Sequence, residues 1–366
     1  MRSVPSFFIF FFMSKIGIVG GGIIGATIAY ELSKIKNLKI TLYETNRTIE
    51  GATSAALGVL VGISSHKKSG RAWQLRQESI TAYPGLIAQL EHLTGSPIAH
   101  NSQGLIHLCF DSDSLAKWQQ LQGYRKNWTL DIWNPSELSR KCPEIANADI
   151  IAAIYSPSDW QINPKELTRA LWKASSLNQV DLRLGQNVSK IIESQNKQSC
   201  LGVIVNGEFE PLDYLVIAAG LRSQKLTDKI QLQPVLGQAV HLQLKEYKYR
   251  DFHPVVTGKD VHIVPQSSGE YWVGATVEYG QSNPELLQGV LETAVSFCPI
   301  LAQSSILSSW IGERPRPEGM YAPVIKKISE NIILATGHYR NGVLLAPATA
   351  LRVKEMILND SEYPLG

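Results

Sequence analysis

Three glycines near the start of the chain have the spacing of a dinucleotide-binding turn. Gly20, Gly22 and Gly25 follow an apolar stretch at residues 16–19 and precede a stretch of helical composition. The first glycine permits a tight turn, the second lets the backbone approach a pyrophosphate, and the third lets the helix pack against the strand. Unpaired N–H groups at the start of that helix favour an anion. The motif predicts a pyrophosphate site but does not separate FAD from NAD.

A glutamate at the end of the next strand-like stretch supports the same interpretation. Glu44 closes the run at residues 40–43 and lies where an acidic side chain can bind both hydroxyls of an adenosine ribose. In this context, a glycine turn with packing roles alone is disfavoured. Small residues at positions 51–58 could let the backbone follow a large planar cofactor, the alternative being a plain flexible loop.

Two arginines further along the chain have the surroundings of ligand-binding residues. Arg314, in GERPRP, and Arg340, in GHYRNG, lie among small or apolar residues. A planar guanidinium suits bidentate recognition of a carboxylate better than a lysine does. These surroundings favour recognition of a carboxylate by both arginines, the alternative being ordinary surface ion pairing, which we assign to Arg316.

The hydrophobic pattern indicates which elements position these residues. Residues 213–220 and the stretch from residue 332 have the continuous apolar character of parallel strands buried on both faces. Residues 235–277 alternate as in an antiparallel sheet. Helices are expected at residues 73–94 with an interruption at Pro84, from Pro164 after a cap at Asn163, and over about 348–358.

This order of elements predicts an α/β fold in which a Rossmann-like nucleotide-binding domain is discontinuous. An α+β substrate domain built on an antiparallel sheet is inserted into it. We assign residues 14–85, 155–228 and 315–360 to the nucleotide-binding domain and residues 86–154 and 229–314 to the substrate domain. Residues 1–13 are expected to form an extension outside the fold.

Composition excludes several classes of protein. Hydrophobic residues make up 44% and charged residues 18% of the 366 positions, which favours a buried core over disorder or coiled coil. A net charge of +3 is too small for a nucleic-acid-binding surface. The isolated cysteines predict no metal site, no disulfide framework and a reducing, cytoplasmic compartment. They are Cys109, Cys142, Cys200 and Cys298.

A phenylalanine-rich run precedes the first predicted strand. Five of the nine phenylalanines fall within residues 7–12. The run is shorter than the roughly 20 residues needed to cross a bilayer, so we expect no integral membrane segment, and no small-residue cleavage site follows it. We interpret it as an extension upstream of a natural start at Met13, the alternative being a weak membrane-surface tether.

Several motifs together resemble one family of flavoproteins. They are GGGIIGATIAYEL, GATSAALGVL, SDWQINPKEL, PVLGQ, VHIVP with VGATVE, WIGERP and GHYRNGVLLAPATA. Over residues 15–358 the chain is similar to the glycine oxidase branch of the D-amino-acid oxidase family. GHYRNG followed by LLAPAT is the most specific of these motifs. The resemblance implies that the Rossmann-like domain is an FAD-binding domain and that FAD is bound non-covalently.

The resemblance also implies which residues contact the cofactor and the substrate. By position, the cofactor-binding set is Gly20, Gly22, Ile23, Ile24, Gly25, Glu44, Thr45, Ala52, Thr53, Leu57, Gly58, Val59, Val188, Gly220, His338, Tyr339, Arg340, Asn341, Gly342, Val343 and Leu344. The substrate-binding set is Arg314, Arg340 and His262. The absence of cysteine between Pro299 and Leu345 disfavours covalent flavin.

The implied reaction is the oxidation of a small amine, with glycine as the leading substrate. A hydride passes from the α-carbon to flavin N5, the imine hydrolyses to glyoxylate and ammonia, and O2 is the expected acceptor, giving H2O2. The flavin carries the difficult step, so we name no general base. The resemblance also implies a role in supplying the thiazole of thiamine. A homo-oligomeric state is left open.

Three alternatives remain open. The first is a D-amino-acid or sarcosine oxidase or dehydrogenase, which could reduce a quinone in place of oxygen. The second is the flavin domain of a tRNA-modifying enzyme, against which the near-neutral charge counts. The third is a flavin-binding protein without catalysis.

His262 is the main departure from the family pattern. Glycine oxidases usually have a tyrosine there that bonds the substrate carboxylate, and the segment after Arg314 differs as well. In VHIVP, strand alternation places His262 opposite Val261 and Ile263, either facing a cavity or as a half-buried sheet histidine with a backbone partner. If it faces the carboxylate, we expect its pKa to lie near the ordinary value of about 6.5.

Overall fold

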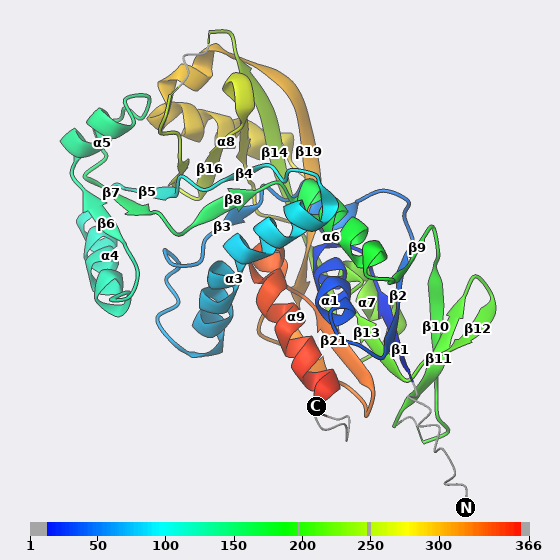
Figure 1. Ribbon diagram of the computed structural model, residues 1–366. Coiled ribbons are helices and arrows are strands. Elements are labelled where there is room, and N and C mark those ends of the chain that lie inside the picture. The colour runs from blue at the N-terminus through cyan, green and yellow to red at the C-terminus, as the bar shows by residue number, and fades with distance from the viewer. Residues whose placement is uncertain (1–12, 197, 247–249, 360–366) are drawn as a thin grey trace, which may run out of the picture.

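Two large β-sheets organise the chain, one parallel and one largely antiparallel (Figure 1). The computed structural model describes residues 13–359 except residues 197 and 247–249. The predicted N-terminal extension therefore lies outside the described residues, apart from Met13. In the described part of the chain, no helix is both long enough and apolar enough to span a bilayer.

The first sheet collects strands from distant stretches of the sequence. Its order is β20-β21-β13-β1-β2-β9, and every neighbouring pair is parallel except β20 and β21. The strands are β1 (Ser14–Val19), β2 (Leu38–Glu44), β9 (Asp181–Leu184), β13 (Tyr214–Ile217), β20 (Val324–Lys327) and β21 (Ile332–Thr336). The continuous apolar stretches that predicted buried parallel strands are thus neighbours in one sheet.

Each face of this sheet is covered by a different layer. Ile16 and Ile18 of β1 face a helical layer, whereas Val19 lies on the other face. The helices of that layer are α1 (Ile23–Ser33), α3 (Gly70–Thr94), α6 (Pro164–Leu177) and α9 (Gly342–Leu358). The opposite layer is the small antiparallel sheet of β10 (Val188–Glu193), β11 (Cys200–Val205) and β12 (Glu208–Pro211). The sheet is therefore buried on both sides, as its sequence requires.

Two of these helices differ from the expectation. α3 runs through Pro84 without the predicted interruption, and α9 begins at Gly342, before the predicted start near residue 348. α9 contains Pro347, which has no N–H to donate to the carbonyl of Val343 one turn earlier. The hydroxyl of Tyr83 in α3 donates to that carbonyl instead. The tertiary contact lets the helix continue through its proline.

α6 begins where the sequence predicts. The side-chain oxygen of Asn163 accepts hydrogen bonds from the backbone N–H groups of Lys165 and Glu166, at 3.1 and 3.2 Å. Pro164 occupies the first turn, where its missing N–H costs nothing. This cap fixes the start of a helix that packs directly against α1.

The second large sheet carries the other half of the molecule. Its strands run in the order β18-β14-β17-β16-β15-β5-β7-β6, with β19 on the second edge of β14. They are β5 (Leu105–Cys109), β6 (Asp131–Trp133), β7 (Ala152–Ser156), β14 (Leu232–Leu244), β15 (Val255–Gly258), β16 (Val261–Pro265), β17 (Glu270–Gly274), β18 (Glu278–Tyr279) and β19 (Ser304–Pro317). Only β15 and β5 pair in parallel.

Helices and short strands complete the structure around these sheets. α8 (Pro284–Phe297) packs on the second sheet through Val290, Ala294 and Phe297. The remaining elements are α2 (Gly51–Ala55), α4 (Ser112–Tyr124), α5 (Pro135–Lys141), α7 (Ser223–Leu226), β3 (Val59–Leu60), β4 (His100–Asn101), β8 (Trp160–Ile162), η1 (Gly220–Arg222), η2 (Ser267–Gly269), η3 (Pro299–Gln303) and η4 (Tyr339–Asn341).

The architecture agrees with the predicted fold class, an α/β domain with an inserted α+β domain on an antiparallel sheet. The residue boundaries between the two domains stay predictions.

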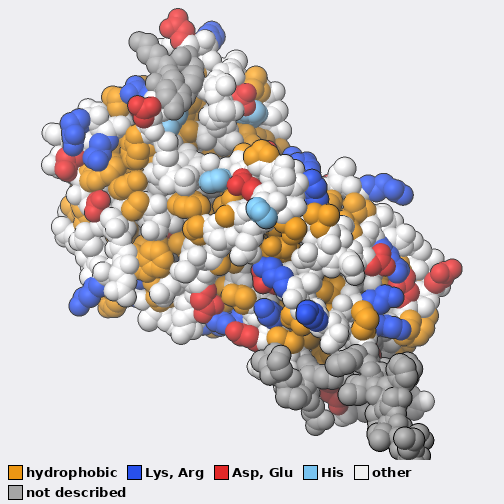
Figure 2. Space-filling view, viewed as in Figure 1, with side chains coloured by type: hydrophobic (Ala, Val, Ile, Leu, Met, Phe, Trp, Pro, Cys, Tyr) orange, Lys and Arg blue, Asp and Glu red, His pale blue; other side chains and the backbone are white. Residues whose placement is uncertain are grey.

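All four cysteines are buried and free, and no group of side chains in the described residues has the composition of a metal site. Figure 2 shows acidic and basic side chains interspersed over one face of the molecule. That face therefore carries no large field of one sign.

Candidate functional site

One cavity of about 670 Å³ is lined by nearly all of the residues predicted to bind the cofactor or substrate. It lies at the carboxyl ends of β1, β2 and β13, where ligands bind in open α/β sheets. From the predicted sets, the structure brings together Gly20, Gly22, Ile23, Ile24, Glu44, Thr45, Ala52, Thr53, Leu57, Gly58, Val59, Val188, Gly220, His262, Arg314, His338, Tyr339, Arg340, Gly342, Val343 and Leu344. Gly25 and Asn341 do not line the cavity.

The glycine turn forms one wall of the cavity from backbone alone. Gly20 has a φ of +106°, and a Cβ there would lie 2.5 Å from the carbonyl oxygen of Ala218. A Cβ on Gly25 would lie 1.8 Å from the carbonyl oxygen of Gly20. Gly25 therefore acts behind the turn, by letting α1 pack against it. The turn leaves a cradle at the N-terminus of α1 that fits a pyrophosphate.

Side chains from three other elements hold this turn in place. The Glu44 carboxylate accepts hydrogen bonds from the N–H groups of Gly21, at 2.6 Å, and Asn46, at 2.9 Å. The indole N–H of Trp172 in α6 donates to the carbonyl of Gly21 at 2.8 Å. Thr53 Oγ1 accepts the N–H of Ile23 at 3.0 Å. Glu44 thus fixes the loop conformation as well as lying at the predicted ribose position.

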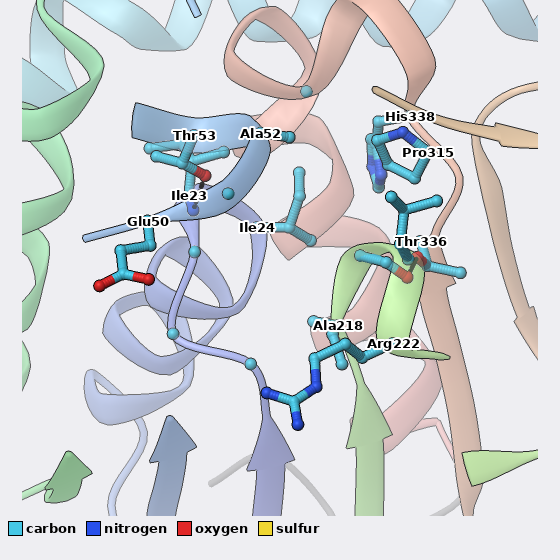
Figure 3. A pocket seen from close by; sticks show the side chains of 18 of the residues that line it. Ile23, Ile24, Glu50, Ala52, Thr53, Ala218, Arg222, Pro315, Thr336 and His338 are labelled. Atoms are coloured by element: carbon cyan, nitrogen blue, oxygen red, sulfur yellow. Dashed lines mark hydrogen bonds between the residues drawn. The ribbon is translucent and has the colours of Figure 1, made fainter. Parts of the chain in front are cut away.

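The small-residue segment after β2 is an ordered wall and not a flexible loop. α2 places Ala52 and Thr53 across the start of α1 from Ile23 and Ile24 (Figure 3). Gly58 has a φ of +75°, and a Cβ there would lie 1.8 Å from the carbonyl oxygen of Ile162. The small side chains let the backbone come close both to β8 and to the cavity.

The two predicted carboxylate-binding arginines reach the same cavity from different elements. Arg314 comes from β19, and Arg340 lies in η4, just before α9. Burial and the nearby charge of Arg340 lower the pKa of Arg314. Within the described part of the chain, the side chain of Arg340 makes no hydrogen bond or ion pair. Two neighbouring cations that are not neutralised by an acid between them favour an anionic ligand.

Arg314 is held by backbone carbonyls. Its Nη1 donates to the carbonyl oxygens of Leu236, at 2.8 Å, and Thr276, at 3.0 Å. A Cβ on Gly237 would lie only 2.0 Å from Nη2, so the guanidinium lies directly against this glycine. With Nη1 occupied, Nη2 and Nε remain as donors for a ligand.

A buried carboxylate supports the same arginine from behind. Glu278 accepts hydrogen bonds from Thr276 Oγ1, from Gln238 Nε2 at 3.0 Å and from the N–H of Asn283 at 2.7 Å. Burial acts to raise the pKa of Glu278, but these hydrogen bonds and the charge of Arg314 hold it below the usual range. Glu278 therefore fixes the segment whose carbonyl holds Arg314.

His262 faces the cavity, which is one of the two positions that strand alternation left open. Its Nδ1 lies 2.7 Å from the hydroxyl oxygen of Thr257. Burial, followed by the charges of Arg340 and Arg314, lowers the pKa of His262 to about 4. The expected pKa near 6.5 is therefore wrong for the free site, because burial desolvates the ring and the charges of two arginines act on it. The imidazole is neutral at physiological pH.

His338, Pro315 and Thr336 lie across the cavity from Ile23 and Thr53 (Figure 3). Tyr339, the next residue after His338, lines the same cavity. His338 Nε2 lies 2.9 Å from Thr349 Oγ1, and burial lowers the pKa of His338 to about 3. Tyr339 has a left-handed backbone with φ 53°. Burial and the neighbouring Tyr279 raise the pKa of Tyr339, so its phenol stays protonated.

Three residues of this site were absent from the sequence interpretation. Trp172 and Gly237 act by contacting Gly21 and Arg314, so no local motif marks them. Arg222 lines the cavity, and its side chain extends toward the turn that follows β1 (Figure 3). A cation after the buried strand at 213–220 was the only available signal for it.

Comparisons with known proteins identify relatives over nearly the whole chain. The chain is 29% identical over 363 residues to the glycine oxidase of Bacillus licheniformis, covering 94% of this chain and 92% of that protein. It is 29% identical over 364 residues to the bifunctional protein ThiO/ThiG of Synechocystis, covering 96% of this chain. The chain spans about half of that bifunctional relative, 53% of its length.

A solved structure and a family model extend the likeness to the whole fold. The crystal structure of glycine oxidase from Geobacillus kaustophilus matches with a TM-score of 0.84 at 26% identity, over 96% of this chain and 97% of that one. Residues 15–356 match the family model described as FAD dependent oxidoreductase. The cradle of backbone at the α1 N-terminus fits the pyrophosphate of this cofactor, and none of the four cysteines lines the cavity. The chain belongs to the FAD-dependent oxidoreductase family.

Proposed function

We propose that this chain oxidises glycine, or an amino acid or amine of similar size, with FAD as its cofactor. The observation that carries this proposal is the pair formed by Arg314 and Arg340, which have unused N–H donors in the cavity that contains the dinucleotide cradle. Guanidinium groups recognise a carboxylate through paired charged hydrogen bonds. The glycine oxidases among the relatives support the choice of substrate.

The residues of the cavity would bind and orient the substrate. Arg314 and Arg340 hold the carboxylate, which leaves the α-carbon and amine facing the cofactor-binding wall. FAD, when bound, supplies the acceptor for a hydride from the α-carbon. Glu44, Trp172 and Thr53 keep the glycine turn in the conformation that holds the cofactor. In the complete reaction, glycine, water and O2 give glyoxylate, ammonia and H2O2.

The proposal is tested by adding glycine to the FAD-loaded protein without oxygen. Loss of the absorbance of oxidised flavin is expected, and a protein that only binds flavin would stay yellow. Sarcosine and D-alanine are tested in parallel, because both arginines recognise the carboxylate common to all three compounds. Peroxide yield in air then separates an oxidase from a dehydrogenase that requires a quinone.

We further propose that the product serves the synthesis of the thiamine thiazole in the cytoplasm. The bifunctional ThiO/ThiG relatives support this role, and four free, buried thiols fit a reducing compartment. The test is growth of a thiazole-requiring strain that lacks glycine oxidase. Wild-type chain should restore growth, and Arg340→Ala should not.

A further inference from the structure

A row of polar side chains crosses the second sheet and ends in the cavity. His107 of β5 pairs with Thr257 of β15, and Thr257 pairs with His262 of β16. Residues paired directly across neighbouring strands project from the same face of a sheet. His107, Thr257 and His262 therefore share the face on which His262 meets the cavity.

The far end of this row is fixed by a loop. His107 Nε2 lies 2.7 Å from the Ser64 hydroxyl. The Asp159 carboxylate accepts the N–H groups of Gly62, Ile63 and Ser64 at 2.7 to 2.8 Å. Arg125 donates to three carbonyls of the same loop. Ser64 and His107 are therefore held in fixed positions.

The hydroxyl of Thr257 has a single hydrogen-bond partner among the described residues. Thr257 is buried, with 8% of its surface exposed, and within the described residues its hydroxyl bonds His262 Nδ1 and not His107. A buried hydroxyl whose hydrogen has no acceptor is costly, whereas an unused lone pair costs less. The Thr257 hydroxyl therefore donates its hydrogen to Nδ1 of His262.

We infer that Thr257 sets the tautomer of His262, so that Nε2 carries the ring hydrogen and donates it to the substrate carboxylate between Arg314 and Arg340. A neutral imidazole has a hydrogen on only one of its two ring nitrogens. Because Nδ1 accepts the hydrogen of the threonine hydroxyl, the ring N–H lies on Nε2. The pair His262 and Thr257 thereby supplies the neutral donor that a tyrosine hydroxyl would supply at this position. This inference rests on the proposed function for the identity of the acceptor.

The experiment compares Thr257→Val with Thr257→Ser in the FAD-loaded protein. Valine keeps the volume and the branching that suit a strand but removes the hydroxyl, and serine keeps the hydroxyl. The dissociation constant of glycolate is read from the flavin absorbance. We expect Thr257→Val to raise it about tenfold, and Thr257→Ser to remain near wild type.

A double-mutant cycle separates this positioning role from a general effect on the fold. In a His262→Phe background, Thr257→Val should change the glycolate dissociation constant by less than about twofold, because the donor is already absent. An equal loss in both backgrounds would overturn the inference. Unchanged glycolate binding in Thr257→Val alone would overturn it as well.

The tautomer is measured directly and without substrate. In protein labelled with ¹⁵N-histidine, the two ring nitrogens have distinct shifts according to which one carries the hydrogen. We expect Nε2–H for His262 in wild type and in Thr257→Ser. Nδ1–H in wild type would refute the inference whatever the substrate is. Failure of wild-type protein to bind glycolate, with Nε2–H present, would instead overturn the proposed function.

Discussion

Replacing Gly237 with alanine tests how closely Arg314 must be positioned. The added Cβ would lie 2.0 Å from Nη2 and 2.3 Å from Cζ and Nη1 of Arg314, whereas ordinary contacts begin at 3.4 Å. The guanidinium must therefore move by roughly 1.4 Å, the difference between 3.4 and 2.0 Å. Such a shift breaks its bonds of 2.8 and 3.0 Å to the carbonyls of Leu236 and Thr276.

The expected loss follows from one displaced charged hydrogen bond. Hydrogen bonds to charged groups contribute about 1.5–3 kcal/mol, which corresponds to a rise of about 10- to 150-fold in the dissociation constant of a carboxylate ligand. FAD content should stay at the wild-type level, because Gly237 lies at the arginine end of the cavity and away from the glycine turn. The measurement is glycolate binding followed by flavin absorbance.

A matched control is available in α8, the helix that packs on the sheet containing Gly237. Gly289 lies in α8, and a Cβ there would meet open space. Gly289→Ala should bind glycolate as wild type does and stabilise the helix slightly. Wild-type affinity in Gly237→Ala, with FAD retained, would refute the reasoning and show that the position of Arg314 does not control carboxylate binding.

Four further changes test other parts of the site. Gly22→Val should lose FAD, because its Cβ would lie 3.1 Å from Thr53 Oγ1 and the rest of its side chain would enter the cradle. A purified variant with full flavin absorbance would contradict this. Arg340→Lys should raise the KM for glycine about tenfold, equivalent to about 1.4 kcal/mol, with a smaller change in kcat; an unchanged KM would return Arg340 to a structural role. The lowered pKa of His338, about 3, means that the unfolded chain binds a proton there below pH 6.5 and the folded chain does not, so stability is lost as pH falls from 6.5 toward 4. In urea unfolding, the free energy of unfolding should change less with pH in His338→Gln than in wild type, by up to about 1.4 kcal/mol per pH unit. Equal slopes in the two proteins would argue against a buried neutral ring. Because the pKa of His262 is about 4, the pH profiles of glycolate binding by wild type and His262→Tyr should be parallel between pH 6 and 8. The two profiles should diverge only below about pH 5, where protonated His262 attracts the anion. Divergence above pH 6 would show that the pKa of His262 is not lowered.

The parts of the structure that follow from neighbouring residues were predictable from sequence. The turn at Gly20, Gly22 and Gly25 and the cap at Asn163 depend on contacts within a few residues or on backbone conformations that only certain residues adopt. The fold class followed from the alternation of buried-strand and antiparallel patterns. These predictions needed no knowledge of distant contacts.

The parts that sequence reasoning missed depend on residues far apart in the chain. The predicted start of α9, near residue 348, is too late: the helix runs through Pro347, and the donor that replaces its N–H is Tyr83, 260 residues from Val343. The pKa of His262 was misjudged because its desolvation arises only when β16, β19 and η4 meet. The structure brings Arg314 and Arg340 together, and their role as carboxylate ligands stays a prediction.

The elements on either side of η4, β21 and α9, follow their packing partners in the sequence, and this order affects how the protein folds during synthesis. β21 joins the parallel sheet beside β13, and α9 packs against α1 and α3. A ribosome releases β1 and α1 long before β21 and α9, which follow them in the sequence. The part of the α1 surface that packs on α9 therefore stays uncovered until α9 is made, whereas the part that packs on α6 can be covered earlier. We expect the nascent chain to need protection from aggregation and to acquire its flavin only after synthesis of α9.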